Sequence, residues 1–88
     1  IMASVKNLKK DINYTLGDII EECYIAQMLT PSNSEKTEAI IDEAIATFDE
    51  LIEKLHAKNV ENKKAHYKAI NAELEVKANA LVEKLNKL

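Results

Sequence analysis

The sequence predicts an all-α fold, an antiparallel three-helix bundle with up-down-up topology, formed by residues 1–88 as a single domain. The 88 residues include one glycine and one proline, whereas a β-sandwich or barrel needs turn residues about every 8–12 positions. Apolar residues make up 47% and charged residues 31% of the chain, a balance typical of folded domains. Along three segments the apolar residues recur at intervals of three and four, which is the periodicity of one helix face.

The first expected helix spans residues 5–29. Gly17 lies in its middle, where it costs about 1 kcal/mol relative to Ala, so we expect a neighbouring helix to approach closely there. Cys23 lies on the apolar stripe, which favours a small buried side chain over a nucleophile, and a lone cysteine cannot form an internal disulfide. The stripe consists of Val5, Leu8, Ile12, Leu16, Ile19, Cys23 and Ala26.

The second expected helix spans residues 33–57. Pro31 disfavours a helical conformation at Thr30, so the first helix ends there. Ser32 followed three residues later by Glu35 has the spacing of a capping box, and we expect this pair to start the second helix. The stripe of this helix consists of Ile41, Ala44, Phe48, Leu51 and Leu55, widened by Ile45 and Ile52.

The third expected helix spans residues 60–88. The apolar pattern stops after Leu55, and no glycine or proline marks the connection. We place a turn near Lys58 and Asn59, where Asn59 can cap the next helix, and one continuous helix is the alternative. The third stripe consists of Tyr67, Ile70, Leu74, Ala78, Leu81, Leu85 and Leu88.

Charge is divided unevenly among these segments, although the net charge is only −3. Residues 30–57 carry seven acids against two lysines, whereas residues 58–88 carry seven lysines against four acids. An acidic second helix beside a basic third helix predicts attraction between antiparallel neighbours. The expected gain is modest, because exposed pairs contribute about 0.2–1 kcal/mol each.

Composition argues against several classes of function. All 12 basic residues are lysine, and the lack of Arg with a negative net charge argues against nucleic-acid binding. No apolar run of about 18 residues is present, so we expect no membrane span. Residues 1–6 lack the pattern of a secretory signal, and with the single cysteine this favours the cytoplasm. Without a glycine-rich phosphate loop or a nucleophile–base arrangement, we expect neither an enzyme nor a cofactor.

Glu53 and His56 have the Glu-x-x-His spacing that carboxylate metal bundles use. Both side chains can reach one ion, but Leu51 and Leu55 occupy the core direction, and the chain holds no second copy of the motif. We therefore expect no metal site here and interpret the pair as a solvated glutamate beside a boundary histidine. Glu53 and His56 remain the candidate ligands if a metal is bound.

Five carboxylates follow one flank of the second helix, about one per turn. A solvated face, partly neutralised by lysines of the third helix, is the simplest interpretation. A surface for a basic partner and a site for Ca²⁺ or Mg²⁺ are the alternatives. We call this set the acidic strip, and it consists of Glu35, Glu38, Asp42, Asp49 and Glu53.

The first helix also carries apolar side chains outside its stripe. Ile20, Tyr24 and Met28 extend the stripe on one side, and Tyr14 and Ile25 lie nearly opposite it. A helix that is apolar on several sides needs burial from more than one direction. These five residues therefore predict an interface between two copies in a homodimer, with an unidentified protein partner or scattered surface residues as alternatives.

Residues 9–14 (KKDINY) and 41–49 (IDEAIATFD) carry a family resemblance. In these segments the chain resembles small helical proteins, without an assigned function, predicted from the genomes of flavobacteria-like bacteria. The resemblance would cover most of the chain. It implies a bacterial cytosolic setting, and it implies no activity, ligand or functional residue.

Together these observations predict a small non-enzymatic interaction or regulatory protein that acts through its helix faces. The acidic strip or the off-core residues of the first helix would occupy a partner's basic patch or groove. One variant is an acidic inhibitor or immunity-like protein for a basic partner. The rival class is a helical bundle that binds a metal or another cation through Glu53, His56 and neighbouring acids.

Overall fold

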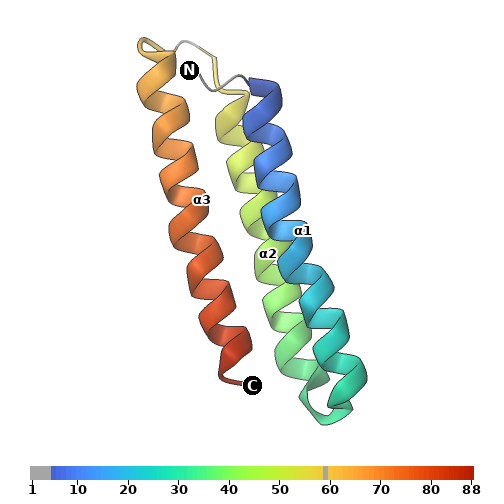
Figure 1. The fold of residues 1–88 in the computed structure, drawn as a ribbon. Helices are drawn as coiled ribbons and strands as arrows, with labels where there is room; N and C mark the ends of the chain where they lie inside the picture. The colour runs from blue at the N-terminus through green and yellow to red at the C-terminus, as the bar shows by residue number, and fades with distance from the viewer. Residues whose placement is uncertain (1–4, 59) are drawn as a thin grey trace.

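The structure is a computed structural model and describes residues 5–58 and 60–88. This part of the chain forms three long helices, α1 (Val5–Leu29), α2 (Ser34–Leu55) and α3 (Lys63–Asn86), and a short 3-10 helix, η1 (Pro31–Asn33). The helices lie lengthwise beside one another in a body of 48 × 22 × 18 Å (Figure 1). The all-α prediction is confirmed for these residues. None of the described helices combines the length and the apolarity needed to cross a membrane.

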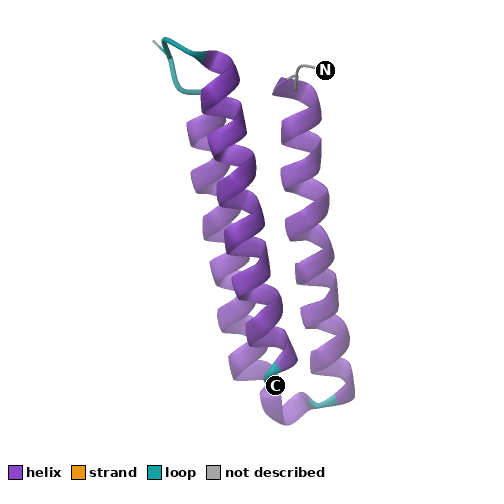
Figure 2. Cartoon of the chain, turned by 60° about the vertical axis from the view of Figure 1, so that its left-hand side comes forward, coloured by secondary structure: helices purple, strands orange, loops and turns teal. Residues whose placement is uncertain are grey.

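Successive helices run in opposite directions. The connection between α1 and α2 lies at the end where the C-terminus lies, and the connection between α2 and α3 lies at the end where α1 begins (Figures 1 and 2). Each helix also contacts the other two. The ion pairs between α2 and α3 follow this antiparallel order, because residues later in α2 pair with residues earlier in α3. The pairs are Lys54–Glu73, Glu50–Lys77 and Glu43–Lys84.

The core lies where the stripes of the three helices meet. Leu8 to Cys23 of α1 and Ile70 to Leu81 of α3 supply the stripes that the sequence predicts, whereas Leu88 is 36% exposed. The side chain of Val5 lies outside the described residues. The buried apolar residues are Leu8, Ile12, Leu16, Ile19, Cys23, Ile40, Ile41, Ala44, Leu51, Leu55, Ile70, Leu74, Ala78 and Leu81.

The buried face of α2 is rotated from the expected one. Ile45 is 47% exposed, so its assignment to the core is wrong, whereas Ile40, Thr37 and Thr47 are buried. The Thr47 hydroxyl donates to the carbonyl of Glu43 at 2.8 Å. Because a threonine hydroxyl can be satisfied by the preceding turn of its own helix, threonine occupies core positions that apolar periodicity overlooks.

The connection between α1 and α2 differs from the expected capping box. Pro31 opens η1, so Ser32 is already helical and α2 begins two residues later, at Ser34. Asn33 precedes α2 and makes no side-chain cap hydrogen bond. The Thr37 hydroxyl instead donates to the carbonyls of Asn33 and Ser34, at 3.3 and 3.0 Å. The capping-box prediction is wrong because proline at the first position of η1 fixes a helical turn earlier in the chain.

The second and third helices are separate, because α2 ends at Leu55 and α3 begins at Lys63. They are therefore shorter than the expected spans of 33–57 and 60–88. The expected cap, Asn59, lies outside the described residues. Asn62 caps α3, and its side-chain oxygen accepts from the Ala65 backbone N–H at 3.1 Å.

His66 joins the start of α3 to the end of α2. Its Nε2 atom donates to the backbone carbonyl of Lys54 at 2.7 Å. Carbonyls in the last turn of a helix have no partner within the helix. The Lys54 carbonyl also accepts from the Ala57 backbone N–H at 3.2 Å, so His66 adds a second donor there and ties the first turn of α3 to the last turn of α2.

Candidate functional site

The contact between α2 and α3 is lined by alternating charges. The shortest ion pairs across it join Lys84 to Glu43 at 2.6 Å, Lys54 to Glu73 at 2.7 Å, and Lys77 to Glu50 at 2.9 Å. Lys54 also lies 3.2 Å from Glu50, and Lys77 lies 3.1 Å from Glu73. We call this set the ion-pair ladder, and its members are Glu43, Glu50, Lys54, Glu73, Lys77 and Lys84.

The ladder shifts the pKa values of its inner members in opposite directions. The pKa of Glu50 is lowered by hydrogen bonds from Lys77 and, to a smaller extent, from Lys54. The pKa of Glu73 is lowered by Lys54 first and Lys77 second. Glu73 in turn raises the pKa of Lys54, and Glu50 raises the pKa of Lys77. The charged form of each group is therefore favoured in the folded chain.

The acidic strip takes no part in the ion pairs of the ladder, although Glu53 is close to Glu50 and Lys54. All five of its carboxylates are exposed. Among the described residues none of them forms an ion pair, because the lysines of α3 pair with Glu43 and Glu50 on the other flank of α2. Neutralisation of the strip by the third helix, which the sequence favoured, is therefore wrong. The sequence does predict an acidic helix beside a basic one, but not which acids face it.

Glu53 and His56 line one surface hollow of about 760 Å³, together with Glu50, Lys54 and Ala57. Both candidate ligands are exposed. Lys54 places a cation in the same hollow, and the described residues contain no group of three or more His, Cys, Asp and Glu side chains that could hold a metal ion. Two exposed ligands beside an ammonium group form a poor divalent-cation site.

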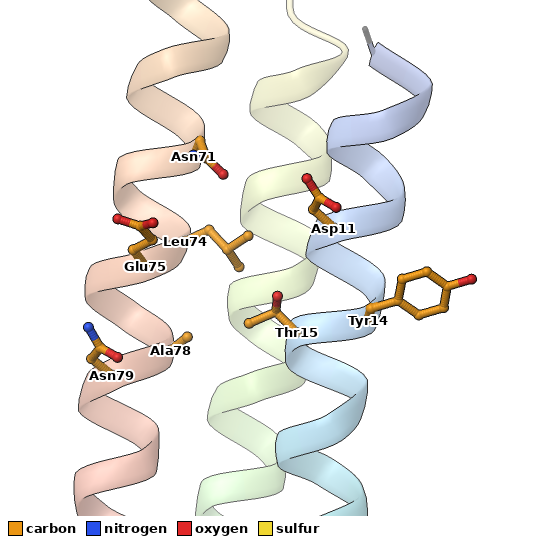
Figure 3. Close-up of a pocket in the computed structure, with 8 residues that line it drawn as sticks. All are labelled: Asp11, Tyr14, Thr15, Asn71, Leu74, Glu75, Ala78 and Asn79. Atoms are coloured by element: carbon orange, nitrogen blue, oxygen red, sulfur yellow. The ribbon is translucent and has the colours of Figure 1, made fainter. Parts of the chain in front are cut away.

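The outer face of α1 exposes large apolar side chains. Met28 is 80% exposed, Tyr14 59%, Tyr24 55% and Ile25 50%. The Tyr14 ring points away from the other two helices (Figure 3), and the ammonium group of Lys10 lies 5.8 Å from its centroid. Four of the five predicted interface residues are therefore accessible to a partner.

Two expectations about α1 need correction. Ile20 is half-buried and packs against the core, so it is not part of the accessible face. Gly17 was expected to mark the close approach of a neighbouring helix. A Cβ atom at Gly17 would meet nothing within 4 Å, so no helix of the described chain lies against it.

A shallow groove of about 580 Å³ runs between α1 and α3. Leu74 and Ala78 contribute apolar surface, and polar side chains of both helices surround them (Figure 3). Sequence reasoning missed this groove, since apolar periodicity identifies a buried stripe but does not tell which neighbour each flank meets. The lining residues are Asp11, Tyr14, Thr15, Asn71, Leu74, Glu75, Ala78 and Asn79.

Cys23 is fully buried in the core, as the sequence predicts. Burial raises the pKa of its thiol, and the negative charge of Glu22 raises it further. A thiol held in its protonated form is a weak nucleophile. The side chain therefore serves packing in the core.

No protein-family model, curated protein or solved structure matches this chain. Among the described residues, the outer face of α1 exposes large apolar side chains, and the acidic strip forms no ion pair.

Proposed function

We propose that this protein is a small, non-enzymatic, cytoplasmic interaction protein, an up-down-up three-helix unit that works as a homodimer joined through α1. The observation that carries the proposal is the outer face of α1, where Tyr14, Tyr24, Ile25 and Met28 are 50–80% exposed. Exposed apolar side chains gathered on one helix are typical of protein interfaces. A buried single cysteine, Cys23, fits a reducing compartment.

Light scattering tests the homodimer. We expect a mass near twice the 9.9 kDa of one chain, falling towards one chain in the double variant Tyr14→Ser and Met28→Ser. Val76→Ser is the matched control, since Val76 is 69% exposed but lies on α3. A single-chain mass for the unaltered protein at high concentration would contradict the proposal.

A second role, the neutralisation of a basic protein partner, is favoured by the acidic strip. Its five exposed carboxylates have no ion pair within the described residues, whereas Glu43 and Glu50 on the same helix do. Unpaired carboxylates along one flank produce a negative local potential that attracts cationic surfaces. This role would make the protein an acidic inhibitor that covers a lysine- or arginine-rich site.

Calorimetry with an oligolysine peptide tests this second role. We expect heat of binding that is lost in the double variant Asp42→Asn and Asp49→Asn. The control variant, Glu61→Gln and Glu83→Gln, loses the same charge outside the strip and should retain the heat. Equal losses in both variants would mean that net charge alone attracts the peptide. Heat with Mg²⁺ or Ca²⁺ would instead support a cation-binding protein.

A further inference from the structure

Six positions on the outer face of α1 have the spacing of a coiled-coil seam. They are separated alternately by four and three residues, so they lie along one side of the helix. The three aromatic or apolar members are more than half exposed, and the remaining three are exposed as well. We call this set the α1 seam, and it consists of Lys10, Tyr14, Gly17, Glu21, Tyr24 and Met28.

Charge along α1 is ordered by sign. Lys6, Lys9 and Lys10 lie in its first two turns, whereas Asp18, Glu21 and Glu22 lie in its second half. The exception is Asp11, which lines the groove between α1 and α3 and is not a member of the seam. A helix dipole favours the opposite order, with acids near the N-terminus and bases near the C-terminus. The order of charges on α1 therefore does not stabilise the helix on its own. It matches the charge order of a second α1 that runs in the opposite direction.

Gly17 lies at the centre of the seam. Glycine at this position lowers the stability of α1 by about 1 kcal/mol relative to Ala. The space beside Gly17 is open. A glycine lets two helix backbones approach more closely than any residue with a side chain. Its position, with Tyr14 on one side and Glu21 on the other, is where two crossing helices would touch.

We propose that two copies of this chain pair through their α1 seams in antiparallel orientation, with Gly17 of each copy at the crossing point. This rests on the proposed homodimer and assigns its geometry. With the two-fold axis at Gly17, Tyr14 of one copy lies opposite Glu21 of the other, and Lys10 lies opposite Tyr24. Because Lys10 already leans over the Tyr14 ring of its own chain, its ammonium group is directed towards the level of the opposing Glu21.

A parallel pair is disfavoured by the same residues. It would bring Lys10 against Lys10 and Glu21 against Glu21, and facing like charges oppose association. The antiparallel pair repeats each favourable contact twice, once on each side of the axis, as a two-fold interface requires. It also places the Tyr14 ring of each copy beside the Gly17 crossing.

Charge reversal tests this geometry, with the dissociation constant of the dimer measured by sedimentation equilibrium. We expect Lys10→Glu alone and Glu21→Lys alone to weaken the dimer by about tenfold or more. The double variant restores the opposite pairs and should recover most of the affinity. Both side chains are exposed, so circular dichroism should report unchanged helix content. Lys68→Glu, an exposed reversal on α3, is the control and should leave the constant unchanged.

The outcomes separate this inference from the proposed homodimer. A single-chain mass for the unaltered protein would overturn both. A dimer whose dissociation constant is unmoved by either single reversal would overturn the antiparallel seam and leave the homodimer standing. A double variant as weak as the single variants would also overturn it, since it would mean that Lys10 and Glu21 do not lie near each other across the interface.

Discussion

The ion-pair ladder and the α1 seam use charge in opposite ways. In the ladder, opposite charges alternate between α2 and α3 and meet within one chain at 2.6–2.9 Å. On α1 the three lysines come first and, apart from Asp11, the acids come later, and the apolar seam residues beside them are exposed. The difference indicates what each surface is for. Charges matched inside the chain join α2 to α3, whereas we propose that the charges of the α1 seam are matched by an inverted second copy of the same helix.

The largest effect is expected in the core, which supports both surfaces. Leu16 is 1% exposed, and Leu16→Ala should lower the free energy of unfolding by about 2–5 kcal/mol because it leaves a cavity. That is a large share of the stability of a small domain. Urea unfolding of dilute protein measures the loss. Met28→Ala, on the exposed side of the same helix, should change the midpoint little, and equal losses would contradict the described core.

Gly17→Ala should separate the stability of the fold from self-association. In dilute protein we expect the free energy of unfolding to rise by about 0.5–1 kcal/mol, since Ala is the better helix former and its Cβ meets nothing. At high concentration the added methyl group should hold the two helices apart and weaken the dimer. Urea unfolding of this variant measures the gain in stability, and sedimentation equilibrium of the same variant measures the weakening of the dimer. Stabilisation together with tighter association would contradict the crossing at Gly17.

Ala69→Gly is the control for this prediction. Ala69 is an exposed position in the middle of α3 and lies outside the seam. The substitution should lower the free energy of unfolding by a similar amount, as expected from helix propensity. It should leave the dissociation constant of the dimer unchanged.

The smallest effect is expected from the ladder, because its side chains are partly exposed and solvent screens them. The pKa values of Glu50 and Glu73 are lowered from 4.5, so their contribution is full above that value and is lost as the pH falls through the lowered values. The pKa values of Lys54 and Lys77 are raised from 10.5, so their contribution to the stability of the fold is full below pH 10.5. It is lost as the pH rises through the raised values.

Glu73→Gln should therefore lower the urea midpoint slightly at neutral pH and leave it unchanged where the carboxylates are protonated. High salt should reduce the difference from the unaltered protein. Glu83→Gln, an exposed acid of α3 outside the ladder, is the control and should not move the midpoint. A deficit of Glu73→Gln that persists at acid pH would mean that its packing, and not its charge, stabilises the contact.

The existence of three helices could be predicted because their apolar residues recur with a clear period from Leu8 to Leu81. The rotation of α2 could not, since Thr37 and Thr47 are buried through hydrogen bonds that periodicity does not register. Pro31 marked a break, but its 3-10 turn moved the start of α2 beyond Ser32.

Some surface features could likewise be predicted from the sequence, and others could not. The exposed side chains of α1 could be predicted, because Tyr14, Ile25 and Met28 lie off its stripe. Which acids of α2 meet the lysines of α3 could not, because Glu43 and the strip residue Asp42 are adjacent in sequence yet lie on different flanks. Pairing depends on where α3 packs, and no local pattern in the sequence specifies that.

Distance measurement between two α1 helices tests the central claim most directly. A spin label at Lys6→Cys, in a Cys23→Ala background, reports the separation of the two labelled sites in the dimer. An antiparallel pair centred at Gly17 places them about 35 Å apart, from the rise of 1.5 Å per residue. A separation of about 10 Å would instead indicate parallel helices in contact. That shorter distance, or no distance between chains at all, would contradict the account.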